Sequence, residues 1–132
     1  MDLKDLQGWI DRYVEAWRSN DARAIGELFA ENAVYYTHPF RDPWRGRDEI
    51  VRNWSAEPDA PDTWEARYEA LAVTGHIGVV SGWTKYKDGD EYANAYVIRF
   101  DAGGRAIEFT EWFLKRDLSK SDSVSPAVPY TG

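Results

Sequence analysis

The sequence predicts an α+β fold in which a strongly curved, mostly antiparallel sheet wraps around three N-terminal helices to form a cone with a pocket. Helical periodicity dominates residues 3–56, and strand-like runs separated by glycine-containing turns fill residues 64–117. Helices followed by a run of strands are typical of α+β domains. The sheet must bury one face under the helices, and a strongly twisted sheet that curls around them leaves a hollow at its open end.

The bulk composition predicts a single domain with many aromatic rings. The chain has 132 residues, 43% of them hydrophobic and 30% charged, which is enough for one buried core. Its seven Trp, eight Tyr and five Phe are an excess that fits either an aromatic pocket or a sturdy core. The net charge of −7 argues against binding to nucleic acid and against an anionic membrane surface.

Several classes of chemistry and location are disfavoured by what the sequence lacks. Without cysteine there is no disulfide frame and no thiolate chemistry, which suits the cytoplasm, where we expect the protein to lie. The first residues lack a signal-peptide pattern, and no run is long enough to span a bilayer. Two His residues are too few for a metal site, and no glycine-rich phosphate loop or serine nucleophile motif is present. We therefore expect no metal and no cofactor.

The first helix is expected over residues 3–18. Its buried stripe repeats at helical spacing and consists of Leu3, Leu6, Ile10, Val14 and Trp17. Asp2 is a suitable N-cap, and Asp5 lies in the first turn, where the helix dipole favours a negative charge. This helix is therefore predicted to lie with one face on the sheet.

A second, shorter helix is expected to follow Asp21 and to end at Asn32, and a strand is expected over residues 33–38. The buried stripe of this second helix is predicted to be Ile25, Leu28 and Phe29. Two prolines in residues 39–46 predict a loop that continues neither as a ladder nor as a helix. Gly46 opens the third predicted helix, with acidic residues in its first turn.

Residues 64–74, 77–87, 91–100 and 105–117 are predicted to form a four-stranded antiparallel meander. An Asp-Gly pair at Asp88 and a Gly-Gly pair at Gly103 are hairpin signals between these strands. The proline-containing stretch 56–63 is read as a linker within one domain. We expect one domain over residues 1–118 and a C-terminal tail over residues 119–132.

The chain resembles the nuclear transport factor 2-like superfamily and its SnoaL-like branch of small bacterial proteins, over about residues 3–118. The resemblance is carried by the order and spacing of Arg12-Tyr13-Val14, Asn20-Asp21, Leu28-Phe29-Ala30-Glu31-Asn32-Ala33, Gly46 and Ile98-Arg99-Phe100-Asp101. It implies a cystatin-like cone. The superfamily includes isomerases, epoxide hydrolases, cyclases, dehydratases and non-catalytic binding proteins, so the fold leaves the function open.

Two activities of the superfamily are disfavoured by departures at matching positions. Tyr13 matches the oxyanion-hole tyrosine of the steroid isomerases, but His38 and Tyr96 stand where those enzymes carry their two acids. Trp83 and Lys85 stand where the related epoxide hydrolases carry an Arg and an Asp. What remains resembles the SnoaL-like pattern of a strand-end His and a last-strand carboxylate.

Glu111 is the first candidate for acid/base chemistry. Strand alternation, with the register that the family implies, turns it inward between Phe109 and Phe113. Loss of water there raises the pKa of a carboxyl group and suits a general acid or base near neutrality. The alternative is a structural carboxylate paired with Lys85 or Arg99.

Three further residues complete the predicted catalytic set. His38 is predicted to exchange a proton and to pair with Glu111, or else to be a packed His with a satisfied ring. Tyr13 and Tyr96 are predicted to donate hydrogen bonds to a developing oxyanion, or else to be core residues. The predicted walls of the pocket are Trp17, Tyr36, Trp54, Trp83, Asn94, Phe109 and Phe113.

The outer face of the sheet is predicted to bind a second copy of the chain. It is expected to carry Leu71, Val73, Ala95, Val97, Trp112 and Leu114, which is too apolar a set for an open surface. The resemblance also implies a homodimer through this face.

Three functional hypotheses remain open from the sequence. The first is cofactor-free isomerisation, cyclisation or dehydration of a small, mostly apolar, oxygen-bearing molecule. The second is a binding protein that holds a hydrophobic ligand without turnover. The third is a dimeric scaffold with a filled core.

Overall fold

The structure is a computed structural model that describes residues 1–60 and 62–117. Three helices and six strands follow in the order α1 (Leu3–Ser19), α2 (Ala22–Glu27), β1 (Phe29–Tyr36), β2 (Trp44–Arg45), α3 (Arg47–Ala56), β3 (Trp64–Thr74), β4 (Ile77–Tyr86), β5 (Glu91–Phe100) and β6 (Ala106–Lys115). The predicted α+β class and the antiparallel meander are confirmed. The predicted tail over residues 119–132 lies outside the described residues.

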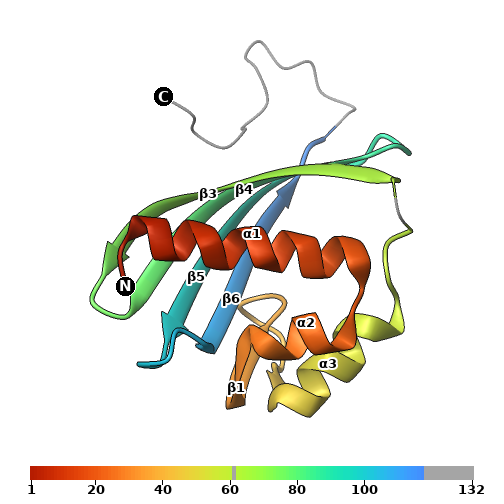
Figure 1. The fold of residues 1–132 in the computed structure, drawn as a ribbon. Helices are drawn as coiled ribbons and strands as arrows, with labels where there is room; N and C mark the ends of the chain where they lie inside the picture. The colour runs from red at the N-terminus through yellow and green to blue at the C-terminus, as the bar shows by residue number, and fades with distance from the viewer. Residues whose placement is uncertain (61, 118–132) are drawn as a thin grey trace.

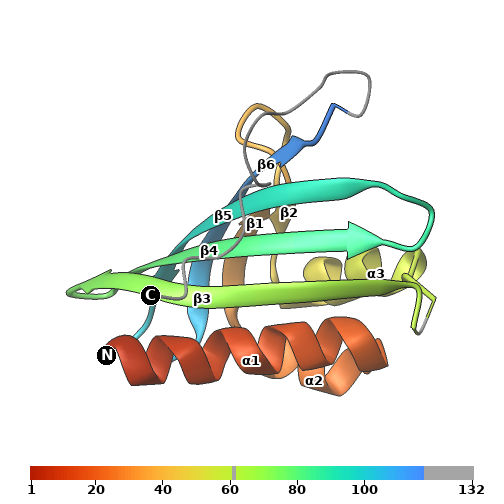
Figure 2. The same ribbon diagram turned by 90° about the horizontal axis from the view of Figure 1, so that it is seen from above.

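One six-stranded mixed sheet has the order β2-β1-β6-β5-β4-β3. The strands β3 to β6 form antiparallel neighbours, whereas β1 pairs in parallel with β6. Figures 1 and 2 show α1 lying along one face of this curved sheet, with α2 and α3 grouped beside β1. The parallel pairing places the early strand against the last one, so both ends of the described chain contribute to the inner face.

The first helix begins and ends at residues that satisfy its free backbone groups. Asp2 and Asp5 form a reciprocal capping box, in which each side chain accepts the other residue's N–H. Asn20 ends α1 in the left-handed conformation, with φ of 53°. Gly78 lets α1 lie close to β4, because a Cβ on this residue would stand 2.7 Å from Cδ1 of Leu6. The caps set the two ends of α1, and the close approach at Gly78 sets its distance from the sheet.

The boundary between the second helix and the first strand differs from the prediction. Helix α2 ends at Glu27 and β1 begins at Phe29, so Asn32 lies within a strand. Leu28 and Phe29 are both buried, as predicted, but Phe29 is a strand residue that pairs with Ala106. Two adjacent apolar residues are compatible with both helical and strand periodicity. The prediction that Phe29 belongs to the helix was wrong.

The loop predicted over residues 39–46 contains the short strand β2. Residues Trp44 and Arg45 pair antiparallel with Tyr35 and Val34. The proline before Trp44 prevents a longer ladder, because it has no N–H to donate, but it does not prevent pairing after it. Trp44 is thereby held against β1, with its ring stacked on that of Tyr35 at a centroid distance of 4.9 Å.

A register shift in β3 changes the predicted outer face. The ladder with β4 skips Leu71, so Ala72 pairs with Val79 and Val73 pairs with Gly78. Val73 therefore packs against the core under the sheet and does not belong to the outer face. The outer face exposes Leu71, Trp112 and Leu114. The homodimer predicted for this face stays a prediction.

Candidate functional site

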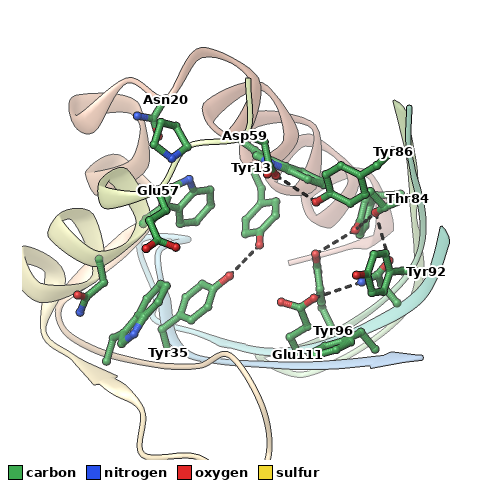
Figure 3. Close-up of a pocket in the computed structure, with 18 residues that line it drawn as sticks. Tyr13, Asn20, Tyr35, Glu57, Asp59, Thr84, Tyr86, Tyr92, Tyr96 and Glu111 are labelled. Carbon is green, nitrogen blue, oxygen red and sulfur yellow. Dashed lines mark hydrogen bonds between the residues drawn. The ribbon is translucent and has the colours of Figure 1, made fainter. Parts of the chain in front are cut away.

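A cavity of about 450 Å³ lies between the inner face of the sheet, the C-terminal half of α1 and the segment after α3. Ten of its lining residues within the described chain are aromatic, namely Tyr13, Trp17, Tyr35, Trp44, Trp54, Tyr68, Tyr86, Tyr92, Tyr96 and Phe113. The polar lining residues are Asn20, Asn53, Glu57, Asp59, Thr84, Asn94 and Glu111. Figure 3 shows the hydroxyl and carboxylate groups of the labelled residues directed into one shared space. The rings make this space apolar, and a few placed polar groups can orient a ligand in it.

Glu111 projects from the middle of β6 into the cavity. The register of β5 and β6 sets it opposite Tyr96, with Phe109 and Phe113 on the same face. The part of Glu111 that stays exposed faces the cavity, since the residue is only partly buried and lines this space. Burial among the rings raises the pKa of Glu111 to about 7, and the hydrogen bond from Asn94 opposes that rise. Near neutrality the carboxyl group can therefore take or give a proton.

A chain of hydrogen bonds that involves four strands, β3 to β6, ends at Glu111. The hydroxyl of Tyr96 donates to that of Tyr68 at 3.1 Å, and the Tyr68 and Thr84 hydroxyls lie 2.8 Å apart. Thr84 donates to Oδ1 of Asn94 at 3.2 Å, and Nδ2 of Asn94 donates to Oε2 of Glu111 at 3.2 Å. Since the amide oxygen can only accept, every donor in this chain points toward Glu111. Oε2 is thereby engaged, and proton exchange with a ligand falls to Oε1.

Two buried tyrosines face the same space from the helix side. The hydroxyls of Tyr13 and Tyr35 lie 2.8 Å apart, and either can be the donor. Burial raises the pKa of both phenols well above the usual value, so both stay protonated at ordinary pH. One of the two hydroxyl protons forms the hydrogen bond between the tyrosines. The other hydroxyl proton remains free to donate to a ligand oxygen. The rings of both tyrosines stack on Phe109, at 5.4 Å and 4.4 Å, which fixes the pair.

The mouth of the cavity is organised around Asp59. Its Oδ2 accepts the indole N–H of Trp17 at 2.8 Å and the hydroxyl of Tyr86 at 3.1 Å. The ring of Trp17 also stacks on Trp64 with a centroid distance of 3.8 Å and an interplanar angle of 9°. These contacts tie the C-terminal end of α1 to β3, β4 and the segment after α3, so the mouth is a defined structure.

Seven of the residues predicted for the site line the cavity, and four do not. The seven are Tyr13, Trp17, Trp54, Asn94, Tyr96, Glu111 and Phe113. Glu111 pairs with neither Lys85 nor Arg99, because its partner is Asn94. Arg99 instead lies 3.9 Å from Glu108 on the outer face of the sheet. The structural alternative stated for Glu111 is therefore wrong.

His38 is not brought to Glu111. Its Nδ1 accepts the backbone N–H of Phe40 at 3.1 Å, and its ring lies edge-on to Phe113 at 6.2 Å. Neither a lining position nor a hydrogen bond to Glu111 is found for His38 among the residues that the structure describes. Strand β1 ends at Tyr36, so His38 lies in the turn that follows the strand and not on the face of β1 that lines the cavity.

The other three predicted site residues that do not line the cavity are Tyr36, Trp83 and Phe109, and each has an identifiable reason. Tyr36 points to the opposite face of β1 from Tyr35, which lines the cavity in its place. Trp83 lies on the outer face, where its indole N–H donates to Glu91 at 2.7 Å and Arg67 covers its ring. Phe109 is fully buried beneath the cavity and supports its floor.

The structure adds functional residues that the sequence reasoning missed. Tyr68 is central to the hydrogen-bonded chain. The sequence feature that could have revealed it is Gly82, which lies opposite Tyr68 on β4. A Cβ at Gly82 would stand 2.1 Å from the Tyr68 ring, so only glycine leaves room for it. Asp59 lies in a stretch that reads as a linker, and its only sequence signal is the pair of prolines that flank it.

The described residues carry neither a metal cluster nor a spanning helix. Over residues 1–60 and 62–117, no three His, Asp or Glu side chains gather closely enough to hold a metal ion. No helix in that part of the chain is both long and apolar enough to cross a bilayer.

Comparisons with known proteins agree with this architecture. An NTF-2-like protein of unknown function from Burkholderia xenovorans LB400 has a TM-score of 0.70 at 16% identity, over 96% of this chain and 98% of that chain. A protein from Sphaerobacter thermophilus has a TM-score of 0.66 at 22% identity, over 83% and 94% of the two chains. An uncharacterized bacterial protein with a cystatin-like fold from Silicibacter pomeroyi DSS-3 has a TM-score of 0.63 at 20% identity, over 84% and 75%. At these identities the likeness establishes the fold.

The sequence itself places the chain in a family. No curated protein matches it significantly. The family model of the SnoaL-like domain matches residues 10–112, which include both halves of the cavity from Tyr13 to Glu111. The chain therefore belongs to the SnoaL-like domain family, with the NTF2-like, cystatin-like fold.

Proposed function

We propose that the cavity binds a small, mostly apolar, oxygen-bearing molecule and that Glu111 moves a proton on it without a cofactor. The observation that carries this proposal is a carboxyl group with a pKa of about 7, directed into a cavity of about 450 Å³. A base works best when its pKa lies near the working pH. The aromatic lining supports an apolar substrate and keeps water away from the carboxylate.

The proposed step is proton transfer at a carbon next to a carbonyl group. Oε1 of Glu111 removes the proton, and the C–H electron pair moves through the new C=C bond onto the carbonyl oxygen. In an isomerisation the protonated Glu111 returns the proton to another carbon and the carbonyl re-forms. In a dehydration the enolate expels a β-hydroxyl group, which takes the proton of Glu111 and leaves as water. Both sequences balance without an external oxidant or reductant.

The hydroxyl pair of Tyr13 and Tyr35 is proposed to stabilise the enolate oxygen. The pair keeps one O–H free, and both phenols stay neutral because burial raises their pKa. Fixed donors aimed at a developing negative charge contribute strongly to catalysis in a dry site. The proton of Tyr96 is already directed to Tyr68, so Tyr96 acts through the hydrogen-bonded chain that orients Glu111.

A generic proton-transfer substrate tests this function before the natural one is identified. The probe is 5-nitrobenzisoxazole, an apolar molecule that opens when a base removes its ring C–H proton. The electron pair forms the C≡N bond, the N–O bond breaks, and a coloured nitrophenolate is released. We expect Glu111→Gln to lower this rate by at least about 100-fold, the range of general-base catalysis.

The matched control is Glu108→Gln on the outer face of the same strand, where the same charge is removed far from the cavity. It should keep the wild-type rate. Equal rates in wild type and Glu111→Gln would refute the acid/base role. Binding of the probe with no Glu111-dependent turnover would favour the alternative, a binding protein without catalysis.

A further inference from the structure

The charges that face the cavity all have one sign. Glu57, Asp59 and Glu111 line it, and the lining residues in the described chain include no Lys, Arg or His. The chain as a whole carries a net charge of −7, so the field from the rest of the molecule does not reverse this sign. An anionic ligand would meet carboxylates at both the mouth and the floor, and no described lining residue is a cation that could offset the repulsion.

Asp59 is held rigidly at the mouth. Both donors to it, the Trp17 indole and the Tyr86 hydroxyl, bind the same oxygen, Oδ2. Oδ1 accepts no hydrogen bond from the residues that the structure describes and keeps its lone pairs for a ligand. Burial, with a further contribution from Asp59, raises the pKa of Tyr86, so this phenol stays a neutral donor.

Glu57 supplies a second carboxylate at the rim, directly after α3. Figure 3 shows its carboxylate turned toward the space in front of Tyr13 and Tyr35. Glu57 is exposed, whereas Asp59 is partly buried, so the two acids lie at different depths of one entrance. A group that enters between them passes from the solvated acid to the fixed one.

Aromatic rings that line the same cavity are suited to form the other half of a cation site. Trp17, Trp54, Tyr86 and Tyr92 line the cavity together with the two acids. The face of an indole or phenol ring attracts an ammonium group, and ring cages with nearby acids are how quaternary ammonium ligands are recognised. The same rings also provide apolar contacts for the methyl or methylene groups around the nitrogen.

We propose that the ligand of this cavity is an organic cation, with an amine or quaternary ammonium nitrogen at Asp59 and an apolar, oxygen-bearing part at Glu111. This inference rests on the proposed function only in that both place the ligand in the same cavity. It adds the charge and the orientation of the ligand. It also excludes carboxylates, phosphates and sulfonates as substrates.

Isosteric probes separate charge from shape. The cation is (3-hydroxyphenyl)trimethylammonium, the neutral isostere is 3-tert-butylphenol, and the anion is 3-hydroxybenzenesulfonate. Calorimetry should show the ammonium compound bound about tenfold more tightly than the phenol, which corresponds to the strength of a partly desolvated cation–π and carboxylate contact. The sulfonate should not bind. Equal affinity for the cation and the phenol in the wild-type protein would overturn the inference.

The substitution Asp59→Asn keeps the shape of the side chain but removes its charge. The amide oxygen can still accept hydrogen bonds from Trp17 and Tyr86. The substitution should lower the affinity for the ammonium compound by about tenfold and leave that for 3-tert-butylphenol unchanged. The control is Asp62→Asn, which removes the same charge nearby, outside the lining, at a φ of 60° that Asn also adopts. Equal effects of the two substitutions on the ammonium compound would overturn the placement at Asp59.

The two proposals fail in different ways. If the cation shows no preference while 5-nitrobenzisoxazole turnover still depends on Glu111, only the charge inference is overturned. If the cation binds selectively while Glu111→Gln turns over as fast as wild type, only the catalytic proposal is overturned. Glu57→Gln, at the exposed rim, provides a second test of the charge should Asp59→Asn fail to fold, and an unchanged ammonium affinity there would count against the inference.

Discussion

The side-chain amide of Asn94 donates to Oε2 of Glu111 across 3.2 Å, from the strand next to the one that carries the carboxylate. This bond stabilises the ionised form of a group that burial pushes toward the neutral form. The balance of the two effects places the pKa of Glu111 near 7, well above its ordinary value of 4.5. The amide therefore tunes the group as well as orienting it.

Asn94→Leu removes this donor without a large change in volume. The pKa of Glu111 should rise by about one further unit, because a hydrogen bond to a charged group is worth about 1.5 kcal/mol or more. The pH profile of probe turnover should shift upward by the same amount. Thr84→Val, which leaves the amide in place but removes its support, should shift the profile less. Identical profiles in all three proteins would contradict this role of Asn94.

Glu111→Gln should stabilise the protein at alkaline pH. The folded-state pKa of Glu111 lies above its unfolded value, so the folded state holds the proton more tightly. The contribution of Glu111 to the free energy of unfolding is then largest below about pH 4.5 and falls as the pH rises through about 7. A rise of this size corresponds to a penalty of about 3 kcal/mol at alkaline pH.

Urea unfolding at about pH 5 and about pH 8 measures this effect. The gain of Glu111→Gln over wild type should be larger at the higher pH. Other carboxylates change between the two conditions in both proteins, so the difference isolates Glu111. A gain that is the same at both pH values would show that burial does not shift its titration.

The Tyr13–Tyr35 pair should show non-additive substitution effects. Removing either hydroxyl with a Phe substitution leaves the other tyrosine with a free O–H that can still donate. Each single variant should therefore lose little probe turnover, whereas the double variant should lose about 100-fold. Multiplicative losses from the two single substitutions would show that the hydroxyls act separately. Retained near-ultraviolet circular dichroism would confirm that the stacking on Phe109 survives.

Gly82→Ala should displace Tyr68 and interrupt the hydrogen-bonded chain. The added Cβ would lie 2.1 Å from the ring, which forces the ring or the strand to move. We expect a loss of about 2 kcal/mol or more in the free energy of unfolding, within the range of overpacked cores. The pH profile of turnover should change as well.

Gly8→Ala in α1 is the matched control, because its new Cβ has nothing within 4 Å. It should stabilise the protein by about 0.5–1 kcal/mol, since Ala is a better helix former than Gly. A destabilisation of similar size in both variants would rule out the steric explanation at Gly82.

The inward position of Glu111 was predicted from strand alternation together with the register of the family that the chain resembles. Phe109 and Phe113 flank it on one face, and the antiparallel partner repeats the alternation with Tyr96. The other face of β6 also carries apolar residues, Trp112 and Leu114, so alternation limits Glu111 to one of two faces and the family register selects the inner one. The carboxylate at the centre of the site could therefore be predicted from the pattern and the resemblance together.

Where the sequence does not alternate, the prediction was wrong. Tyr35 and Tyr36 are identical side chains on opposite faces of β1, so nothing in the doublet distinguishes the inner one. Trp83 follows Gly82 in a stretch of β4 where consecutive residues are buried, and it turned out to face outward. The extra residue at Leu71 reversed the face of Val73. Such bulges depend on the partner strand and leave no local signal.

The parallel pairing of β1 with β6 limits how far the protein can fold while it is being synthesised. Tyr35 is synthesised early but sits beside Phe109, so the floor of the cavity is incomplete until the final strand has left the ribosome. Until then Tyr13 and Tyr35 lack the ring of Phe109 on which both stack, and loop closure over most of the described chain is needed to bring it to them. Strand β6 therefore supplies Glu111 and completes the sheet at the same time. A nascent chain stalled before β6 lacks both the carboxylate and the finished cavity floor.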